Sequence, residues 1–104
     1  MVYAIYHTHT FDRSLDRMPK DFQEWLTKVE NQLVENPFVG DQIRVPCFRE
    51  KKKDKQRVYY LIYEELQIVY VVGMSSKKNQ RAVINAIWLF PIVKFPVSIV
   101  RLRQ

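Results

Sequence analysis

Two clusters of lysine and arginine are the residues of this chain best suited to binding a polyanion. Residues 44–57 contain seven Lys or Arg and two acids, and residues 77–81 contain three more cations. The net charge of the whole chain is only +6, so the remaining residues are slightly acidic and the positive charge is local. Such a distribution is typical of a protein that contacts phosphates on one face. The alternative for a single lysine run is a solvated loop.

Arg57 and the Lys77–Lys78 pair are the most distinctive members of these clusters. Arg57 begins a predicted strand, so it can present a fixed guanidinium to a phosphate, whereas loop lysines suit unspecific backbone contact. Ser75 or Ser76 could cap a helix that starts at Lys77, where free N–H groups and lysines together favour an anion. Alternatively, that helix begins a residue or two later. The other cations are predicted to contact RNA: Arg49, Lys51, Lys52, Lys55, Lys77 and Arg81.

Several tyrosines lie between the two clusters and could contact unpaired bases. Exposed aromatic rings stack on bases in RNA-binding proteins, although strand tyrosines are also common as half-buried packing residues. Tyr59 and Tyr60 are neighbours in a predicted strand, so their side chains face opposite ways. One of the two is therefore a candidate for the functional face.

Other kinds of catalytic or binding site have little support in the sequence. His7 and His9 share one face of an extended segment, but no further ligands follow at an indicative spacing, so we expect no metal site and no cofactor. Patterns for a phosphate loop, a serine nucleophile or paired carboxylates are missing. The single Cys47 excludes an internal disulfide. With neither a signal peptide nor an apolar run long enough to span a membrane, a cytoplasmic protein is expected.

The hydrophobic pattern predicts four strands. Residues 57–74 form two β-rich runs separated at Glu64–Glu65, and their nearly continuous apolar character is typical of central strands. Residues 2–7 and 42–49 are predicted as further strands, and Pro46 indicates an edge or a bulge in the latter. Because a tight turn makes the outer ends of a hairpin neighbours, the two basic clusters are predicted to meet at one end of the sheet.

Three helices are predicted around these strands. Residues 11–18 follow Thr10 as a possible N-cap, and residues 19–35 carry an apolar stripe at spacings of three and four. The third helix covers residues 77–88. The fold class is therefore α+β, a two-layer domain in which an N-terminal helical hairpin packs on a mainly antiparallel four-stranded sheet and a C-terminal helix is added.

The end of the chain differs in character from the predicted domain. We place the domain at residues 1–88 and treat residues 89–104 as an apolar extension. Pro91 and Pro96 exclude a regular helix there, yet the segment is too apolar for a disordered tail. It is predicted to pack against the core of this domain or against another chain.

The order of these elements resembles that of a known family. Four segments carry the likeness: Phe11-Asp-Arg-Ser-Leu-Asp-Arg-Met-Pro-Lys, Leu33-Val-Glu-Asn-Pro-Phe-Val-Gly, Arg57-Val-Tyr-Tyr-Leu-Ile-Tyr and Lys77-Lys-Asn-Gln. Together they resemble the RelE/ParE superfamily of toxins from type II toxin–antitoxin systems, with the RelE-like branch favoured. The resemblance implies an α+β domain that cleaves messenger RNA in the ribosomal decoding site without a metal, with the 2′-hydroxyl of the RNA as nucleophile.

The resemblance also implies roles for particular residues. The family's basic positions before and on the third strand match Arg49, Lys51, Lys53 and Arg57, its aromatic position there matches Tyr60, and the cation opening the last helix matches Lys78. The implied partners are a cognate acidic antitoxin, the ribosome and messenger RNA. Two alternatives remain open, a ParE-like toxin that poisons a topoisomerase and an inactive relative that only binds. The implied catalytic residues are Arg57, Lys78, Tyr60 and Lys53.

Overall fold

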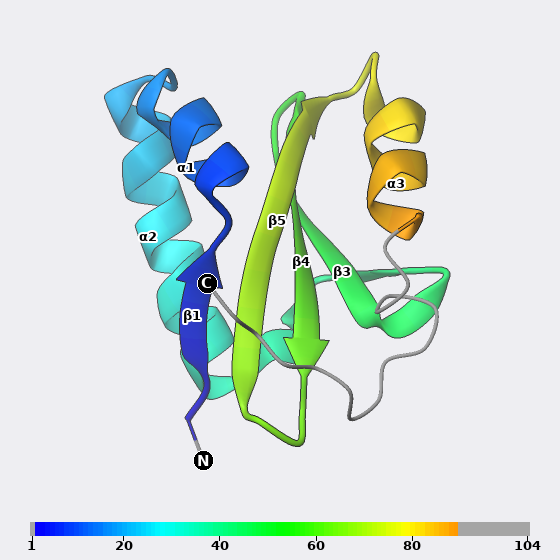
Figure 1. Cartoon of the computed structure of the whole chain (residues 1–104). Helices are drawn as coiled ribbons and strands as arrows, with labels where there is room; N and C mark the ends of the chain where they lie inside the picture. The colour runs from blue at the N-terminus through cyan, green and yellow to red at the C-terminus, as the bar shows by residue number, and fades with distance from the viewer. Residues whose placement is uncertain (1, 90–104) are drawn as a thin grey trace.

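A computed structural model describes residues 2–89. These residues form one sheet with a layer of helices on each side. Along the chain the elements are β1 (Ala4–His7), α1 (His9–Asp16), α2 (Lys20–Glu35), a 3-10 turn (Pro37–Val39), β2 (Asp41–Ile43), β3 (Val45–Lys53), β4 (Gln56–Tyr63), β5 (Ile68–Ser76) and α3 (Gln80–Trp88). Figure 1 shows α1 and α2 on one side of the sheet and α3 on the other. The α+β class is confirmed. Among these residues no helix is both long and apolar enough to cross a bilayer.

The sheet has five strands in the order β1-β5-β4-β3-β2. One more strand is present than predicted, because the backbone turns at Arg44 and separates β2 from β3. The pairing is antiparallel except between β1 and β5, which run parallel. Pro46 lies where the β2–β3 register shifts, so the predicted bulge is confirmed. The sheet is therefore mainly antiparallel, as expected.

The helical pair covers one face of the sheet. The Thr8 hydroxyl accepts a hydrogen bond from the Phe11 N–H and caps α1, so the prediction that Thr10 is the N-cap is wrong by two residues. α2 follows Pro19 and ends at Asn36-Pro37, as the sequence indicated. Because its apolar residues recur every three or four positions, one side of α2 is buried against the sheet. The buried residues are Phe22, Leu26, Val29 and Leu33.

β4 is the central strand and contributes to two separate cores. Its residues from Arg57 to Tyr63 are all buried. Val58, Tyr60 and Ile62 pack with the α1–α2 layer, and the alternate residues Tyr59, Leu61 and Tyr63 pack with α3. A strand buried on both faces reads as a continuous apolar run, which explains the pattern seen in the sequence.

The lysine-rich segment that precedes β4 is a strand and not a loop. β3 continues to Lys53, and pairs Lys52 with Arg57 and Lys51 with Val58. Lysines have low strand propensity, but pairing with the strongly β-forming β4 outweighs it here. Only Asp54 and Lys55 remain in the turn. The prediction that this strand ends at Arg49 and that the lysines after it lie in a loop is therefore wrong.

His7, Asp12 and Glu30 connect β1 to both helices. The His7 imidazole hydrogen-bonds to Asp12 through Nδ1 at 2.6 Å and to Glu30 through Nε2. The hydrogen bond to Glu30 is the largest cause that raises the pKa of His7, and Asp12 adds to it against an opposing effect of burial. The ring is thus held between two carboxylates, which favour its protonated form.

This arrangement predicts that stability depends on pH. A group whose folded-state pKa is raised contributes stability that is fully present below its unfolded pKa, about 6.5, and lost as pH rises through the folded pKa. The free energy of unfolding is expected to fall as pH increases from 6 through that range. His7→Gln should flatten the profile in urea titrations, whereas His9→Gln, at the exposed neighbouring histidine, should retain it. An unchanged profile in His7→Gln would contradict the assignment.

The predicted extension starts at the last described residue. Leu89 directly follows α3 and is 72% exposed. Residues 90–104 lie outside the described part of the chain, so the prediction that this segment packs against the core or another chain remains a prediction.

Candidate anion-binding site

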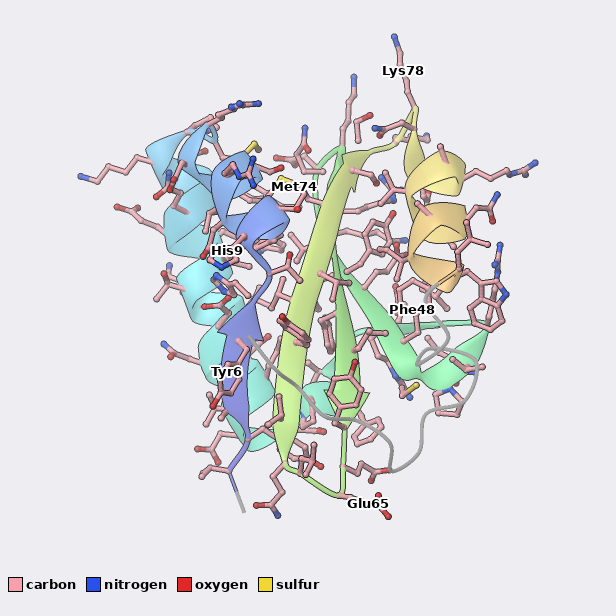
Figure 2. The ribbon with its side chains drawn as sticks, in the orientation of Figure 1. Tyr6, His9, Phe48, Glu65, Met74 and Lys78 are labelled. Atoms are coloured by element: carbon pink, nitrogen blue, oxygen red, sulfur yellow. The ribbon has the colours of Figure 1, made fainter. Side chains whose placement is uncertain are left out.

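The β4–β5 hairpin brings the two basic clusters together. β4 and β5 are joined at the predicted Glu64–Glu65 turn, and at the far end Arg57 pairs with Ser75 and Gln56 with Ser76. Figure 2 shows Glu65 and Lys78 at opposite ends of the molecule. The chain therefore reaches Lys77 directly beside the start of β4, and the predicted convergence is confirmed.

The lysine pair lies just before α3 and not in its first turn. β5 continues through Ser76, and α3 begins at Gln80 after Asn79. The Asn79 carboxamide oxygen accepts hydrogen bonds from the Ser76 backbone N–H at 2.8 Å and hydroxyl at 2.9 Å, which fixes the connection between strand and helix. The alternative of a later helix start is thus confirmed, and Lys77 and Lys78 are exposed on a short ordered connection.

Arg57 is a buried cation with unused hydrogen-bonding capacity. Its side chain is on the α3 face, because it alternates with Val58 and shares a face with Tyr59, whose hydroxyl hydrogen-bonds to Ser75. Arg57 is 9% exposed, and among residues 2–89 its buried Nε has no hydrogen-bond partner. Its Nη1 makes one long contact of 3.5 Å with the Lys55 carbonyl. A buried unpaired donor is costly, so an anion bound here would be stabilised strongly.

A carboxylate lies beside this guanidinium. Glu50 is 5% exposed, and burial raises the pKa of its carboxyl, while Lys52 and Arg57 oppose that effect. Gln80 donates a hydrogen bond to Glu50 at 3.4 Å, and Lys52 Nζ lies 3.9 Å from the other oxygen. Burial also raises the pKa of Tyr59, which is directly opposite Glu50 in the ladder. Glu50 and Tyr59 therefore lie on the same face of the sheet as Arg57.

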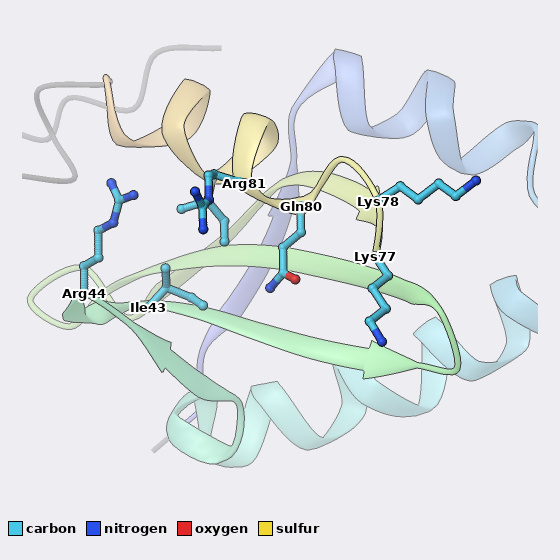
Figure 3. A pocket seen from close by; sticks show the side chains of 7 residues that line it. Ile43, Arg44, Lys77, Lys78, Gln80 and Arg81 are labelled. Atoms are coloured by element: carbon cyan, nitrogen blue, oxygen red, sulfur yellow. The ribbon is translucent and has the colours of Figure 1, made fainter.

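An open cleft of about 490 Å³ runs between α3 and the β2–β3 turn. Figure 3 shows Arg44 and Ile43 at one end, Lys77 and Lys78 at the other, and Gln80 and Arg81 between them. We refer to the cations of this face as the cation cluster. Its members are Arg44, Lys52, Arg57, Lys77, Lys78 and Arg81.

Arg44 is the member that the sequence did not single out. It is held by a 2.7 Å hydrogen bond from its guanidinium to the Asn85 carboxamide oxygen, and its guanidinium carbon lies 5.1 Å from the Trp88 ring centroid. Its φ is +65°, a conformation that costs a non-glycine residue roughly 1 kcal/mol or more. Arg44 is 41 residues from Asn85 in the chain, so no pattern in the local sequence predicts their contact.

Other predicted site residues lie on the opposite face. In register, Arg49 pairs with Tyr60 and Lys51 with Val58, so these side chains face the α1–α2 layer, and Lys53 follows the same alternation. Lys52 alone of the β3 lysines faces α3, and Lys55 is exposed in the β3–β4 turn. The structure therefore brings Arg57, Lys52, Lys77, Lys78 and Arg81 together and leaves Arg49, Lys51, Lys53 and Tyr60 apart from them.

Arg49 and Tyr60 stabilise the loop that follows α2. The Arg49 guanidinium donates to the carbonyls of Pro46, Phe38 and Gly40. The Tyr60 hydroxyl donates to the Pro37 carbonyl at 2.6 Å and accepts from the Gly40 N–H at 3.1 Å. A Cβ on Gly40 would stand 2.4 Å from that hydroxyl, so only glycine fits there. Burial raises the pKa of Tyr60 to about 12.

A metal site does not emerge from the described residues. Among residues 2–89 no group of three or more His, Cys, Asp or Glu side chains is arranged to hold a metal ion. Within these residues the α3 face carries cations, the buried carboxyl of Glu50 and the buried phenols of Tyr59 and Tyr63.

Comparison with known proteins relates this chain to solved structures only. No protein-family model and no curated protein matches it. A double arginine-to-alanine mutant of the Escherichia coli toxin RelE in the free state superposes with a TM-score of 0.74 and 16% identity, covering 86% of this chain and 99% of that one.

Two toxin–antitoxin complexes match as well. The same mutant bound to an antitoxin RelBc peptide has a TM-score of 0.67 and 16% identity, over 80% of this chain and 95% of that one. The archaeal RelE–RelB complex from Pyrococcus horikoshii gives 0.66 and 13%, over 73% and 96%. At these identities the likeness is one of fold: the chain has the RelE fold, as the resemblance in sequence implied.

Proposed function

Starting from a chain that folds like the RelE toxins, we propose that this protein is the toxin of a type II toxin–antitoxin system and cleaves messenger RNA on the ribosome in the cytoplasm. The observation that carries the proposal is Arg57, a buried guanidinium whose Nε has no partner among the described residues, on the sheet face where the cation-lined cleft also opens. Attack of a 2′-hydroxyl on the adjacent phosphate adds negative charge to the phosphoryl oxygens. Fixed cations at that position stabilise the transition state more than the ground state.

The cations are proposed to have two roles, stabilisation of the transition state and binding of the RNA backbone. Arg57 is rigid and desolvated, so each of its donors acts in a low dielectric, where charge stabilisation is largest. Lys77, Lys78 and Arg81 are exposed, and they suit attraction and positioning of the RNA backbone. Lys53 and Tyr60, which the resemblance implied as catalytic, face the other layer and are not part of the proposed reaction site.

Proton transfer can be assigned to two neighbouring groups. A 2′-hydroxyl must lose a proton as it attacks, and the leaving 5′-oxygen must gain one. The Glu50 carboxyl, whose pKa is raised by burial, suits the acceptor role, and the Tyr59 hydroxyl suits the donor role. A Glu50-dependent cleavage rate falls as pH is lowered through that raised pKa.

An acidic antitoxin is the partner that this surface fits. The cation cluster sets six positive side chains against Glu50, so an acidic segment could cover the cleft and neutralise it. Binding of that kind would block RNA by occupying the same cations. We therefore propose that the partner competes with RNA for the α3 face.

Induction of the chain in a bacterial host tests the function. We expect growth arrest, with messages cut at codons occupied by ribosomes, and rescue by the acidic product of a neighbouring reading frame. Mapping the 5′ ends of cleaved messages gives the measurement. Arrest with intact messages and damaged DNA would instead identify a ParE-like topoisomerase poison.

One observation favours a second function, binding without cleavage. The turn of α3 above the site is Ala82-Val83-Ile84, which contains no group able to transfer a proton. If Glu50 and Tyr59 do not replace such a group, the protein would occupy RNA or the ribosome without cutting. RNA binding combined with uncut messages would distinguish this function from the first.

A further inference from the structure

The two ends of the cleft differ in chemistry. Lys77 and Lys78 supply compact ammonium charges at one end (Figure 3). The other end combines the aliphatic side chains of Ile43 and Ile84 with the planar guanidinium of Arg44. A nucleotide has the same division, because its phosphate is a strong anion and its base is a flat, largely apolar ring.

The guanidinium of Arg44 is a planar group that two neighbouring side chains hold in place. The Trp88 ring lies on one side of the guanidinium, with its centroid 5.1 Å from the guanidinium carbon, and Asn85 fixes the in-plane orientation with a 2.7 Å hydrogen bond. Guanidinium planes stack on bases as aromatic rings do. An exposed arginine would ordinarily lose side-chain entropy on binding, but here much of that loss has already occurred.

The backbone at Arg44 supports a functional role. The φ of +65° suits glycine or asparagine, and a turn selected only for stability would favour either of them. An arginine with a positive φ departs from the residue types that this conformation favours, and departures of this kind occur mainly at functional sites. The gain that offsets this backbone strain is the placement of the guanidinium at the end of the cleft.

We propose that Arg44, supported by Trp88 and Asn85, is a base-stacking subsite for single-stranded RNA, and that the strand lies along the cleft with its phosphates toward Lys77 and Lys78. This inference rests on the proposed function, since it assigns an orientation to the same substrate. It adds a contact to a base where the cation cluster alone would contact only the backbone. The preference would be for unpaired bases, because paired bases present no free face.

Binding of a short RNA with and without bases tests the subsite. The probe is a fluorescent 2′-O-methyl hexanucleotide, which cannot be cleaved, together with versions that carry one abasic residue at each position in turn. Wild-type protein is expected to lose roughly tenfold in affinity when the stacked base is removed, and little at other positions. Fluorescence anisotropy at fixed salt gives the affinities.

Arg44→Lys is the decisive variant. It keeps the charge and the backbone strain but removes the planar group, so it should abolish the difference between the intact and abasic probes. Asn85→Ala, at an exposed position, should reduce the difference without altering the fold. Arg17→Lys, on the opposite helical layer, is the matched control and should retain it.

The outcomes separate this inference from the proposed function. If Arg44→Lys retains the full preference for the intact probe, or if wild type binds intact and abasic probes equally, the subsite is overturned while RNA cleavage stands. If wild type binds neither probe, the subsite is overturned, and the mapping of cleaved messages after induction tests the proposed function independently.

Discussion

Arg57→Met is expected to lower the rate of RNA cleavage by about 10²- to 10³-fold while leaving the protein folded. The unbranched side chain of methionine follows that of arginine as far as Nε and keeps the apolar part of the buried packing, but it lacks the guanidinium and presents no charge or donor to the phosphate. Because the wild-type Nε is buried without a partner among the described residues, the fold loses little hydrogen bonding. Replacing a buried charge with an apolar side chain is often neutral or stabilising, so the free energy of unfolding should change by less than about 1 kcal/mol or increase.

Single-turnover cleavage of messenger RNA on ribosomes provides the rate, and circular dichroism melting provides the stability. Arg17→Met is the matched control, because Arg17 is exposed on the connection between α1 and α2. Combining Arg57→Met with Lys78→Met should reduce the rate further. Full toxicity of the double variant would refute the assignment of these cations to the scissile phosphate.

Tyr60→Phe is expected to have the opposite profile, a large loss of stability with little effect on cleavage. Removing the hydroxyl leaves the Pro37 carbonyl and the Gly40 N–H without the hydrogen bonds of 2.6 and 3.1 Å that they now make. Leaving buried groups of this kind unsatisfied costs about 1–3 kcal/mol each, so we expect a loss of roughly 2–4 kcal/mol. For a domain of this size the melting temperature should fall by roughly 10–20 °C.

Cleavage measured well below the melting temperature distinguishes the two possible roles of Tyr60. The structural role predicts a rate within about threefold of wild type, since the phenol faces the α1–α2 layer and burial raises its pKa to about 12. The catalytic role implied by the resemblance requires a rate loss of at least about 10²-fold. Tyr6→Phe, at an exposed tyrosine, controls for the loss of a hydroxyl.

Elements with strong periodicity could be predicted from the sequence. The stripe on α2 and the two apolar runs of β4 and β5 depend on regular spacing, which local composition records directly. The start of α3 could not be placed, because Asn79 and Ser76 form the connection and a serine cap was an equally good reading of the same residues. The second half of β3 differs from the predicted loop because its pairing with β4 is a tertiary effect that the local lysine-rich sequence does not encode.

The position of the candidate site could be predicted from the sequence, but the set of residues that form it could not. That two basic clusters meet followed from the hairpin, yet which cations share a face depends on the β3–β4 register, and a shift of one residue would exchange Lys52 with Lys51 and Lys53. Arg44 joins the cluster through contacts with Asn85 and Trp88, which no local pattern encodes. Arg57 lies in an ordered strand, as predicted, but its burial results from the central position of β4 in the sheet.

The parallel pairing of β1 with β5 has a consequence for the order of folding. Ala4 pairs with Ile68, so this contact closes a loop of more than sixty residues, whereas β3, β4 and β5 are joined by short turns. Short loops close with a smaller entropic penalty, so the β3–β4–β5 meander should form first and β1 should add to its edge last. During synthesis β1 leaves the ribosome first but can pair only after β5 has been made. The half of the sheet that carries the cations, β3 to β5, is therefore expected to assemble before β1 joins it.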